Sequence, residues 1–207
     1  MLFFKRKWHG VSLRASSTAP VHKSDGYLQG QLLVSTPLIT GSCFHRAVIY
    51  LFAHSHEGAM GIIINQPLEE VHYSALLENE ELPATIQDEI QVYYGGPVDR
   101  SRGFVVHSAE YGNDSVIFRH EDIAVSANTT ILRDIIMGNG PKKSLLTIGY
   151  AGWTPGQLEQ EIEENSWITV PASSELIFSI ENDMKWGMAS QSLGIDMNFF
   201  SHAVGHA

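Results

Sequence analysis

The chain of 207 residues is 43% hydrophobic and 10% aromatic, which indicates one globular domain and excludes a mainly disordered protein. The formal net charge is −10, but residues 1–24 hold five basic residues and no acid, so residues 25–207 carry a net charge of −15. A body this acidic repels phosphate backbones, which disfavours direct binding of nucleic acid. No apolar run approaches the ~20 residues of a membrane span, so no membrane association is expected.

Residues 1–26 are expected to form a basic, flexible N-terminal tail outside the folded domain. Its apolar residues come before its first lysine, whereas a secretory signal begins with charges and continues through at least ~7 apolar residues. The serines and the absence of acids leave a weak likeness to an organelle transit segment as the alternative. The single domain is then predicted to cover 27–200, with a frayed tail at 201–207.

Short apolar runs separated by glycine-bearing turns predict a series of strands. The expected strands cover residues 31–35, 47–53, 59–65, 91–94, 104–107, 116–119, 123–125 and 167–170. Residues 54–58 have the length and the glycine of a hairpin turn, and a second turn is expected over 111–114. Short helical or irregular pieces are expected over 73–78 and 84–88.

Helices are expected mainly in the second half of the chain. Asn128 is the expected N-cap of a helix that carries leucine and isoleucine on one face, and Gly138 suits its C-terminal end. Two further helices are predicted over 176–180 and 184–193, the second ending at Gly194. Strands first and helices later predict an α+β fold with a mixed, mainly antiparallel sheet.

Residues 145–159 predict a buried strand, a glycine-rich turn and the start of a helix. The apolar run 145–148 is the strand. The glycines after it permit backbone angles or close approaches that a Cβ obstructs, and they are Gly149, Gly152 and Gly156. Thr154 is the expected N-cap, with Pro155 at the first helical position and Gln157 completing a capping box.

The start of this helix has the general geometry of an anion site at a helix N-terminus. Its glycines do not make the spacing G-x-G-x-x-G, and no Gly-Lys-Ser/Thr follows them. The alternative is a tight turn in which glycines let Tyr150 and Trp153 pack. Farther along, Glu161, Glu163 and Glu164 lie where the helix dipole disfavours negative charge; we interpret them as a solvated face, with a partner surface or cation contact as the alternative.

Residues suited to metal binding or nucleophilic catalysis are present but do not form a complete motif. His54, His56 and Glu57 offer metal ligands, yet in a hairpin turn they are expected to be exposed and to lack a third converging ligand. Cys43 is the only cysteine, which excludes an internal disulfide and indicates a reducing compartment; a small buried hydrophobe is its more common role. No Gly-x-Ser-x-Gly occurs, and we predict no metal or cofactor.

The arginines grouped in the folded body follow a glycine turn. Arg100 and Arg102 suit the binding of a carboxylate or phosphate, although two arginines on a turn are usually solvated. His107 ends a predicted strand, and a hydrogen-bonded core histidine is its alternative to a general base.

Three groups of motifs follow one another along the chain. They are Leu32-Leu33 with Pro37 and then Gly58-Ala59-Met60-Gly61-Ile62-Ile63-Ile64-Asn65; Gly95-Gly96-Pro97-Val98 with Arg102-Gly103-Phe104; and Gly149-Tyr150-Ala151-Gly152-Trp153 with Gly156-Gln157-Leu158-Glu159. Together they resemble the YqgE/AlgH family over about residues 28–195. The chain departs from the family where Gly41-Ser42-Cys43 stands in place of the usual Asp-Pro and where Gln66 stands in place of an arginine.

The resemblance implies an α+β fold whose large mixed sheet closes towards a flattened barrel flanked by helices. It also implies a bacterial type of protein in the cytoplasm. Members of the family are largely uncharacterised, and the AlgH name carries a transcriptional-regulator label. The acidic body argues against direct contact with DNA as the meaning of that label.

We therefore expect a non-catalytic regulatory or binding protein that acts through a protein or small-ligand partner. The alternative is an enzyme or binding domain for a small anionic compound at the glycine-rich turns, and a metal-dependent hydrolase is a third possibility. The candidate ligand-binding residues are Asn65, Gly95, Gly96, Pro97, His107, Gly149, Tyr150, Gly152, Trp153 and Gln157.

Overall fold

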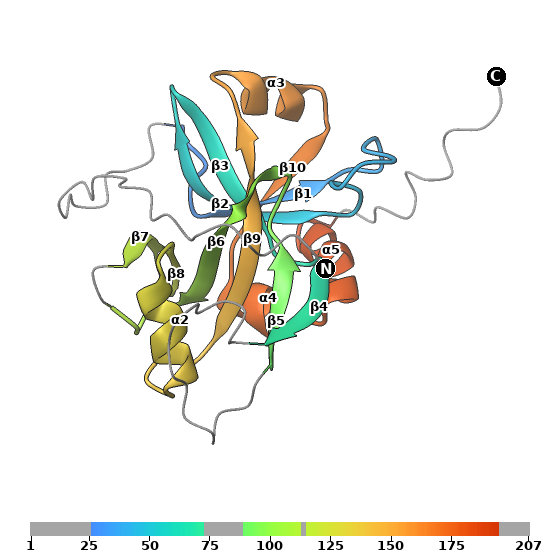
Figure 1. The fold of residues 1–207 in the computed structure, drawn as a ribbon. Coiled ribbons are helices and arrows are strands. Elements are labelled where there is room, and N and C mark those ends of the chain that lie inside the picture. Colours follow the sequence, from blue (N-terminus) through green and yellow to red (C-terminus); the bar gives the residue numbers. More distant parts are fainter. Residues whose placement is uncertain (1–25, 73–88, 113–114, 195–207) are drawn as a thin grey trace, which may run out of the picture.

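A computed structural model describes residues 26–72, 89–112 and 115–194 (Figure 1). The described part is an α+β half-barrel, as the sequence predicts: one ten-stranded sheet with helices packed against it. The strands are β1 (Gln31–Ser35), β2 (Val48–Ser55), β3 (Gly58–Ile63), β4 (Pro67–His72), β5 (Glu89–Tyr94), β6 (Val98–Ser108), β7 (Val116–His120), β8 (Ile123–Ser126), β9 (Ser144–Trp153) and β10 (Trp167–Pro171). The helices are α2 (Thr129–Ile136), α3 (Gln157–Glu163), α4 (Ser174–Phe178) and α5 (Asn182–Gln191).

The sheet runs in the order β10-β1-β2-β3-β9-β6-β8-β7, and β5 joins β4 to β9. Among the described strands only the β5–β9 pair is parallel, so the sheet is mixed and mainly antiparallel. Strand β9 runs through the middle of the molecule in Figure 1 and changes partners along its length. Leu146 in its first half is paired with both β5 and β6, whereas Ala151 in its second half is paired with Gly61 of β3.

Alternating residues of the central strands face two different cores. In β1, Leu32 and Val34 belong to one cluster, which α4 and α5 cover with Trp186. Leu33 belongs to a second cluster, which α3 covers with Leu158. Because the side-chain period of a strand is two, both faces of the sheet are buried here, which explains why these strands are so apolar. A third cluster packs β5, β6 and β9 against α2.

The expected helix after Asn128 is confirmed as α2. The Asn128 side chain accepts hydrogen bonds from the backbone N–H groups of Thr130 and Ile131, and Gly138 follows the helix with φ +75°. These signals are local in sequence, so they are readable without the tertiary structure.

The predicted glycine-rich turn after residue 148 is wrong. Strand β9 continues through Gly149 and Gly152 to Trp153, and the turn comes only at residues 154–156. Gly156, with φ +76°, takes the N-cap position of α3 instead of Thr154. The reciprocal half of the predicted capping box does form, because the Thr154 backbone N–H donates to the Gln157 side chain at 3.0 Å.

Other boundaries also differ from the prediction. The hairpin turn between β2 and β3 is confined to residues 56–57, so His54 lies inside a strand. Strand β6 begins at Val98 rather than at residue 104, and β4 was not predicted. The pieces expected over 73–78 and 84–88, and the tails over 1–25 and 201–207, lie outside the described residues. Within the described ranges, no helix has the length and apolar character needed to cross a membrane.

Candidate functional site

The structure divides the predicted ligand-binding residues among separate places. His107 is paired with Ser144 at the first residue of β9, while Trp153 is its last residue. A ten-residue strand is about 30 Å long, so one pocket cannot contain both ends. The composite site expected from sequence is therefore not formed as a unit, and ligand binding by any smaller subset of these residues stays a prediction.

Gly95, Gly96, Gly149 and Tyr150 come together where the segment after β5 crosses β9. A Cβ on Gly96 would lie 2.2 Å from the backbone carbon of Tyr150, and a Cβ on Gly149 would lie 2.4 Å from the carbonyl oxygen of Gly96. The Gly95 N–H donates to the carbonyl of Ile148 at 2.8 Å. The glycines therefore let two backbones approach closely, and Pro97 follows them as an exposed residue.

Asn65 connects the end of β3 to the start of β2. Its Oδ1 accepts from the Val48 backbone N–H at 2.8 Å, and its Nδ2 donates to the Arg46 carbonyl at 2.9 Å. Arg46 has φ +51°, a conformation that bulky residues adopt rarely, so the amide fixes a strained approach to β2. This structural role uses one donor and one acceptor of the side chain.

His107 is fully buried and belongs to a chain of hydrogen bonds. Its Nδ1 lies 3.0 Å from the Ser108 carbonyl, which can only accept, so Nδ1 carries the proton. Nε2 then accepts from the hydroxyl of Ser126 at 3.0 Å, and Ser126 accepts from Ser115 at 3.2 Å. Burial lowers the pKa of His107, which favours this neutral form. Both ring nitrogens are engaged, as in the hydrogen-bonded core alternative.

At the other end of β9, two indoles share one carboxylate. The Nε1–H groups of Trp153 and Trp167 donate to Glu161 Oε2 at 2.9 and 2.7 Å. The Gln157 amide donates to the other carboxylate oxygen at 2.8 Å. The interpretation of Glu161 as part of a solvated acidic face is therefore wrong: this carboxylate is tied to the core through two buried rings. Glu163 and Glu164 are exposed, as expected.

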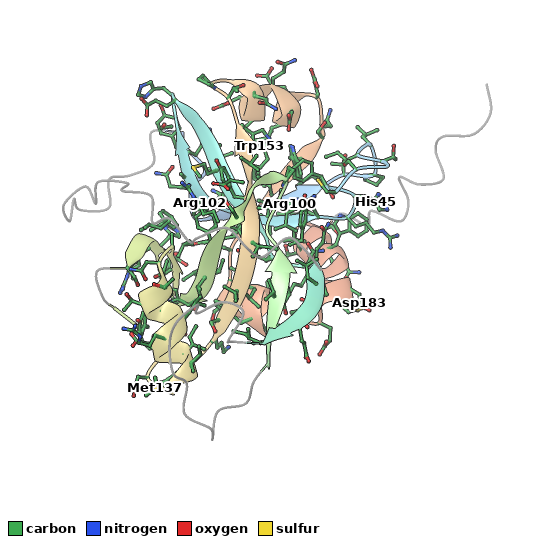
Figure 2. All side chains as sticks on the ribbon, in the orientation of Figure 1. His45, Arg100, Arg102, Met137, Trp153 and Asp183 are labelled. Atoms are coloured by element: carbon green, nitrogen blue, oxygen red, sulfur yellow. The ribbon has the colours of Figure 1, made fainter. Side chains whose placement is uncertain are left out.

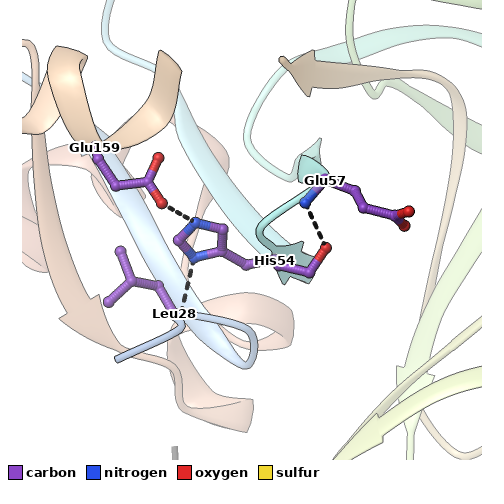
Figure 3. A network of polar contacts seen from close by, with 5 residues as sticks. Leu28, His54, Glu57 and Glu159 are labelled. Atoms are coloured by element: carbon purple, nitrogen blue, oxygen red, sulfur yellow. Dashed lines mark hydrogen bonds and ion pairs between the residues drawn. The ribbon is translucent and has the colours of Figure 1, made fainter. Parts of the chain in front are cut away.

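His54 is buried in β2, and the expectation that it is exposed is wrong (Figure 3). Its Nδ1 accepts from the Leu28 backbone N–H at 3.0 Å, so the proton of a neutral ring lies on Nε2, which points at Glu159 Oε1 at 2.8 Å. The pKa of Glu159 is lowered, first by a hydrogen bond from its own backbone N–H and then by His54. One imidazole thus joins α3, β2 and the segment before β1.

The three candidate metal ligands His54, His56 and Glu57 do not converge. His56 and Glu57 are exposed in the turn, and Figure 3 shows the Glu57 carboxylate pointing away from His54. The Glu57 backbone N–H donates to the Ser55 hydroxyl at 3.1 Å, which closes the hairpin. Within the ranges that the structure describes, no group of three or more His, Cys, Asp or Glu residues is placed to hold a metal ion.

Arg100 and Arg102 lie over aromatic rings near the middle of the molecule (Figure 2). The Arg100 guanidinium carbon is 5.1 Å from the ring centre of Tyr94, and that of Arg102 is 5.8 Å from the ring centre of Tyr150. Burial raises the pKa of the Tyr94 hydroxyl. Stacking positions these cations without joining them into one clamp, and anion binding by the pair stays a prediction.

An open apolar groove lies between β10, α4 and α5. Its volume is about 440 Å³. The lining residues are Val170, Pro171, Ala172, Ser173, Glu175, Leu176, Ile180, Met188, Ser192 and Leu193. Met188 and Leu193 are each 41% exposed, and Met184, four residues before Met188, is 54% exposed. Residues four apart lie on one face of a helix, so α5 presents apolar groups to solvent along the groove.

The chain matches a family model described as AlgH-like over residues 32–198. It belongs to the AlgH-like family. A UPF0301 protein of Bradyrhizobium diazoefficiens is 43% identical over 208 aligned residues, and the alignment covers 96% of this chain and 96% of that protein. A UPF0301 protein of Rickettsia prowazekii is 40% identical over 181 residues, which cover 87% of this chain and 96% of that protein. The resemblance seen in the motifs is thus confirmed.

Two solved structures share the fold. The solution structure of AlgH from Pseudomonas aeruginosa has a TM-score of 0.72 and 34% identity, covering 90% of this chain and 99% of AlgH. The crystal structure of protein DIP2367 from Corynebacterium diphtheriae has a TM-score of 0.66 at 22% identity, covering 87% and 94% of the two chains, and shows likeness of fold alone. The AlgH-like motifs of this chain therefore lie where its fold is built: in β3, at the glycine crossing and along β9 into α3.

Sequence reasoning missed a buried lysine on α5. Lys185 is only 2% exposed, and its Nζ donates to the Ile64 carbonyl at 3.1 Å and to Asn182 Oδ1 at 3.0 Å. Burial lowers the pKa of this lysine to about 8. A lysine in a helix with little apolar periodicity has no sequence signal for burial. The groove beside it was missed for another reason, since three separate elements build it.

Proposed function

We propose that this member of the AlgH-like family is a non-catalytic binding protein whose protein partner docks in the groove of β10, α4 and α5. The open groove carries the proposal, because it combines about 440 Å³ of volume with exposed apolar side chains. Contiguous exposed apolar surface beside a groove is typical of a docking site. The side chains of His54, His107 and Glu161, in contrast, are engaged in hydrogen bonds within the fold.

The chemistry of α5 supports a protein partner. Met184 and Met188 stand on one exposed face, and unbranched thioether side chains adapt their shape to a partner's apolar groups. A groove between two helices and a strand edge accepts an amphipathic or extended segment, which anchors by a few apolar side chains. Two lining residues, Leu176 and Val170, are only 9% and 2% exposed, so part of the groove wall is packed into the core.

Site-specific photo-crosslinking in the source cells tests this proposal. A benzophenone amino acid replaces Met188 in one variant of the full chain and Met137 in the control. Met137 is 52% exposed and follows α2, on a different side of the molecule from Asp183 of α5 (Figure 2). The expected result is a discrete crosslinked protein at position 188, lost when Leu193→Glu is added, and none at 137. Equal crosslinking at both positions, or none at 188, contradicts the proposal.

We further propose that the protein works in the cytoplasm and that its acidic body does not contact DNA. The single Cys43 and the net charge of −15 over residues 25–207 support this. The test is a gel-shift titration of duplex DNA with the full chain carrying Lys5→Glu, Arg6→Glu and Lys7→Glu, which removes nonspecific attraction by the basic segment. No complex is expected at ~0.15 M salt. A tight, salt-sensitive complex speaks against it.

A further inference from the structure

We infer that the partner adds an extended segment to the free edge of β10, as one more strand of the sheet, and places every second side chain of that segment in the groove of β10, α4 and α5. The inference names the binding mode at the same groove, and in that respect it rests on the proposed function. It follows from the backbone hydrogen bonds of β10, which is paired with β1 alone among the described strands.

Backbone groups of β1 point alternately at β2 and at β10. The Ser35 N–H donates to the carbonyl of Ala47, the residue before β2, at 3.0 Å. The Thr36 N–H donates to the carbonyl of Ser166, the residue before β10, at 3.0 Å. Opposite residues of an antiparallel ladder alternate between pairs that exchange hydrogen bonds and pairs that do not. The even-numbered residues of β1 therefore bond to β10, and the odd-numbered ones bond to β2.

The same alternation leaves the far edge of β10 free. Ile168 and Val170 are opposite even-numbered residues of β1, so their N–H and C=O groups bond to β1. Trp167, Thr169 and Pro171 consequently point their backbone groups away from β1. Within the described ranges, no hydrogen bond to these outward groups occurs. A row of unpaired backbone donors and acceptors on an edge strand is a template for pairing with another strand.

The opposite end of the sheet, β7, is covered by side chains. The ring centre of Phe118 in β7 lies 6.2 Å from that of Tyr50 in β2. His120 lies so close to Gly30 that a Cβ there would come within 2.5 Å of its ring. A third edge, β4, leads into residues outside the described ranges. Of the two ends of the strand order, β10 is therefore the open one, and it stands beside the groove.

An added strand places its side chains on both faces of the sheet. Val170 lines the groove together with Met188 and Leu193. Directly opposite residues in a sheet lie on the same face, so the partner residue opposite Val170 faces the groove, as do those two positions away. Trp167 belongs to the cluster on the other face, which α3 covers. The matching segment is thus extended and apolar at every second position, since a helix leaves the edge groups unpaired.

Pro171 limits the length of the pairing. It stands at an outward position and has no N–H to donate. Ser173 then caps α4, so the chain leaves the sheet directly after the proline. A proline on an edge strand ends its ladder. The partner segment therefore pairs with at most the five residues of β10, and the groove must supply part of the affinity.

Acidic residues stand at both ends of β10. Glu163 and Glu164 precede the strand, Glu175 follows it, and all three are exposed. The basic side chains nearby, Lys143 and Arg46, contact the C-terminal end of α4 and the indole of α5 instead. Two copies of a chain with a net charge of −10 also repel each other. The edge thus favours a neutral or basic segment of another protein over a second copy of this chain.

Peptide selection followed by hydrogen exchange tests the inference. Random peptides of ~12 residues, displayed on phage, are selected on the full chain, and a selected peptide is added to the isotope-labelled full chain. Without peptide, the N–H of Thr169 is expected to exchange at least tenfold faster than that of Val170, which bonds to β1. With peptide, exchange at Thr169 is expected to slow at least tenfold. A selection without binders, or binders that leave exchange at Thr169 unchanged, overturns the inference.

Methylation of the peptide backbone distinguishes an added strand from other binding modes without altering the protein. Every second N–H of the bound peptide donates to β10, and those between them point away. N-methylation of one alternate set is expected to raise the dissociation constant at least tenfold, and methylation of the other set less than twofold. Equal effects of the two sets contradict strand addition.

A matched pair of variants tests the edge from the side of the protein. Thr169→Pro removes an outward N–H and leaves the hydrogen bonds to β1 in place, and we expect at least tenfold weaker binding of the selected peptide. Thr169→Val retains the N–H and is expected to bind within twofold of the parent chain. Full-strength binding by a folded Thr169→Pro variant overturns the inference. If thermal unfolding shows that this variant is not folded, the methylated peptides decide.

Other occupants of the edge give different outcomes. Slow exchange at Thr169 that appears without peptide and increases with protein concentration assigns the edge to a second copy. Slow exchange without peptide at every concentration assigns the edge to another part of the same chain. Either result overturns docking of a partner segment there.

The two proposals fail separately. If partner crosslinks at position 188 persist at full strength in Thr169→Pro, the partner occupies the groove without adding a strand, so the proposed function stands and the inference is wrong. If the peptide protects Thr169 with the expected methylation pattern while no partner crosslinks form at position 188, the edge accepts an added strand but the proposed function is wrong.

Discussion

The C-terminal end of β9 and the groove beside α5 differ in how their side chains are satisfied. At the end of β9, the indoles of Trp153 and Trp167 and the imidazole of His54 each have a partner at 3.0 Å or less within the chain. Along the groove, Met188 and Leu193 are each 41% exposed to solvent. The first region is closed by its own residues, while the second is open to another molecule.

This difference explains why the closed region carries recognisable sequence motifs and the groove does not. A buried polar group must be paired, which demands particular residues at particular positions and therefore produces a motif. An apolar docking surface needs only the right size and polarity, and many sequences supply these. The most recognisable residues of the chain thus build the fold, and the proposed binding surface lies in its least distinctive part.

The largest effect is expected at the glycine crossing. Gly96→Ala places a Cβ 2.2 Å from the Tyr150 backbone, so the segment after β5 must move away from β9. We expect the free energy of unfolding to fall by about 4 kcal/mol, from overpacking and backbone strain together. Gly138→Ala is the control: its φ is also positive, +75°, but nothing lies within 4 Å of the added atom, so about 1 kcal/mol is expected. If urea denaturation gives the same loss in the free energy of unfolding for Gly96→Ala and Gly138→Ala, the backbones at Gly96 and Tyr150 are not closely packed.

Removing the carboxylate shared by the two indoles tests the closed region directly. Glu161→Ala leaves the N–H groups of Trp153 and Trp167 without their acceptor, and both rings are buried. We expect a loss of about 3 kcal/mol in the free energy of unfolding. Glu163→Ala, on the same helix but exposed, is expected to change it by less than about 0.5 kcal/mol. If both variants lose a similar free energy of unfolding, Glu161 is a solvated surface residue and its hydrogen bonds to the two indoles do not stabilise the fold.

The lowered pKa of Lys185 predicts that the free energy of unfolding rises at alkaline pH. Its pKa is lowered to about 8 in the folded chain, so from about pH 8 to pH 10 the folded state releases a proton that the unfolded state keeps. Because the unfolded state then binds more protons, stability rises with pH, by about 2 kcal/mol over this window. The measurement compares unfolding midpoints of the parent chain and Lys185→Met from pH 7 to 10. Parallel pH profiles contradict a perturbed Lys185.

The smallest effect on stability is expected in the groove. Met188→Ala removes a side chain that is 41% exposed, so the free energy of unfolding is expected to change by about 0.5 kcal/mol or less. The same substitution is expected to reduce partner crosslinking from a probe at Met184 at least fivefold. A large loss of stability would mean that the Met188 side chain is packed in the core. Unchanged crosslinking would mean that Met188 is not part of the docking surface.

The sequence by itself determined the fold class, the family, most strand positions and α2 with its Asn128 cap. These depend on local periodicity, local hydrogen bonds and motif order, which the linear chain displays directly. The apolar runs at 47–53 and 59–65 predict strands covered on both faces, and the buried residues of β2 and β3 do divide between two core clusters.

Only the tertiary structure decided the rest. The local sequence around Gly149 is typical of a turn, yet Gly149 lies in a strand. A glycine is required there because the Gly96 carbonyl oxygen, from a distant part of the sequence, would lie 2.4 Å from a Cβ. His54 reads as part of an exposed turn, yet Glu159, 105 residues later, engages it in the interior. The groove has no linear signature, since β10, α4 and α5 build it together. Contacts between distant residues depend on how the whole chain packs, and such packing overrides local preference.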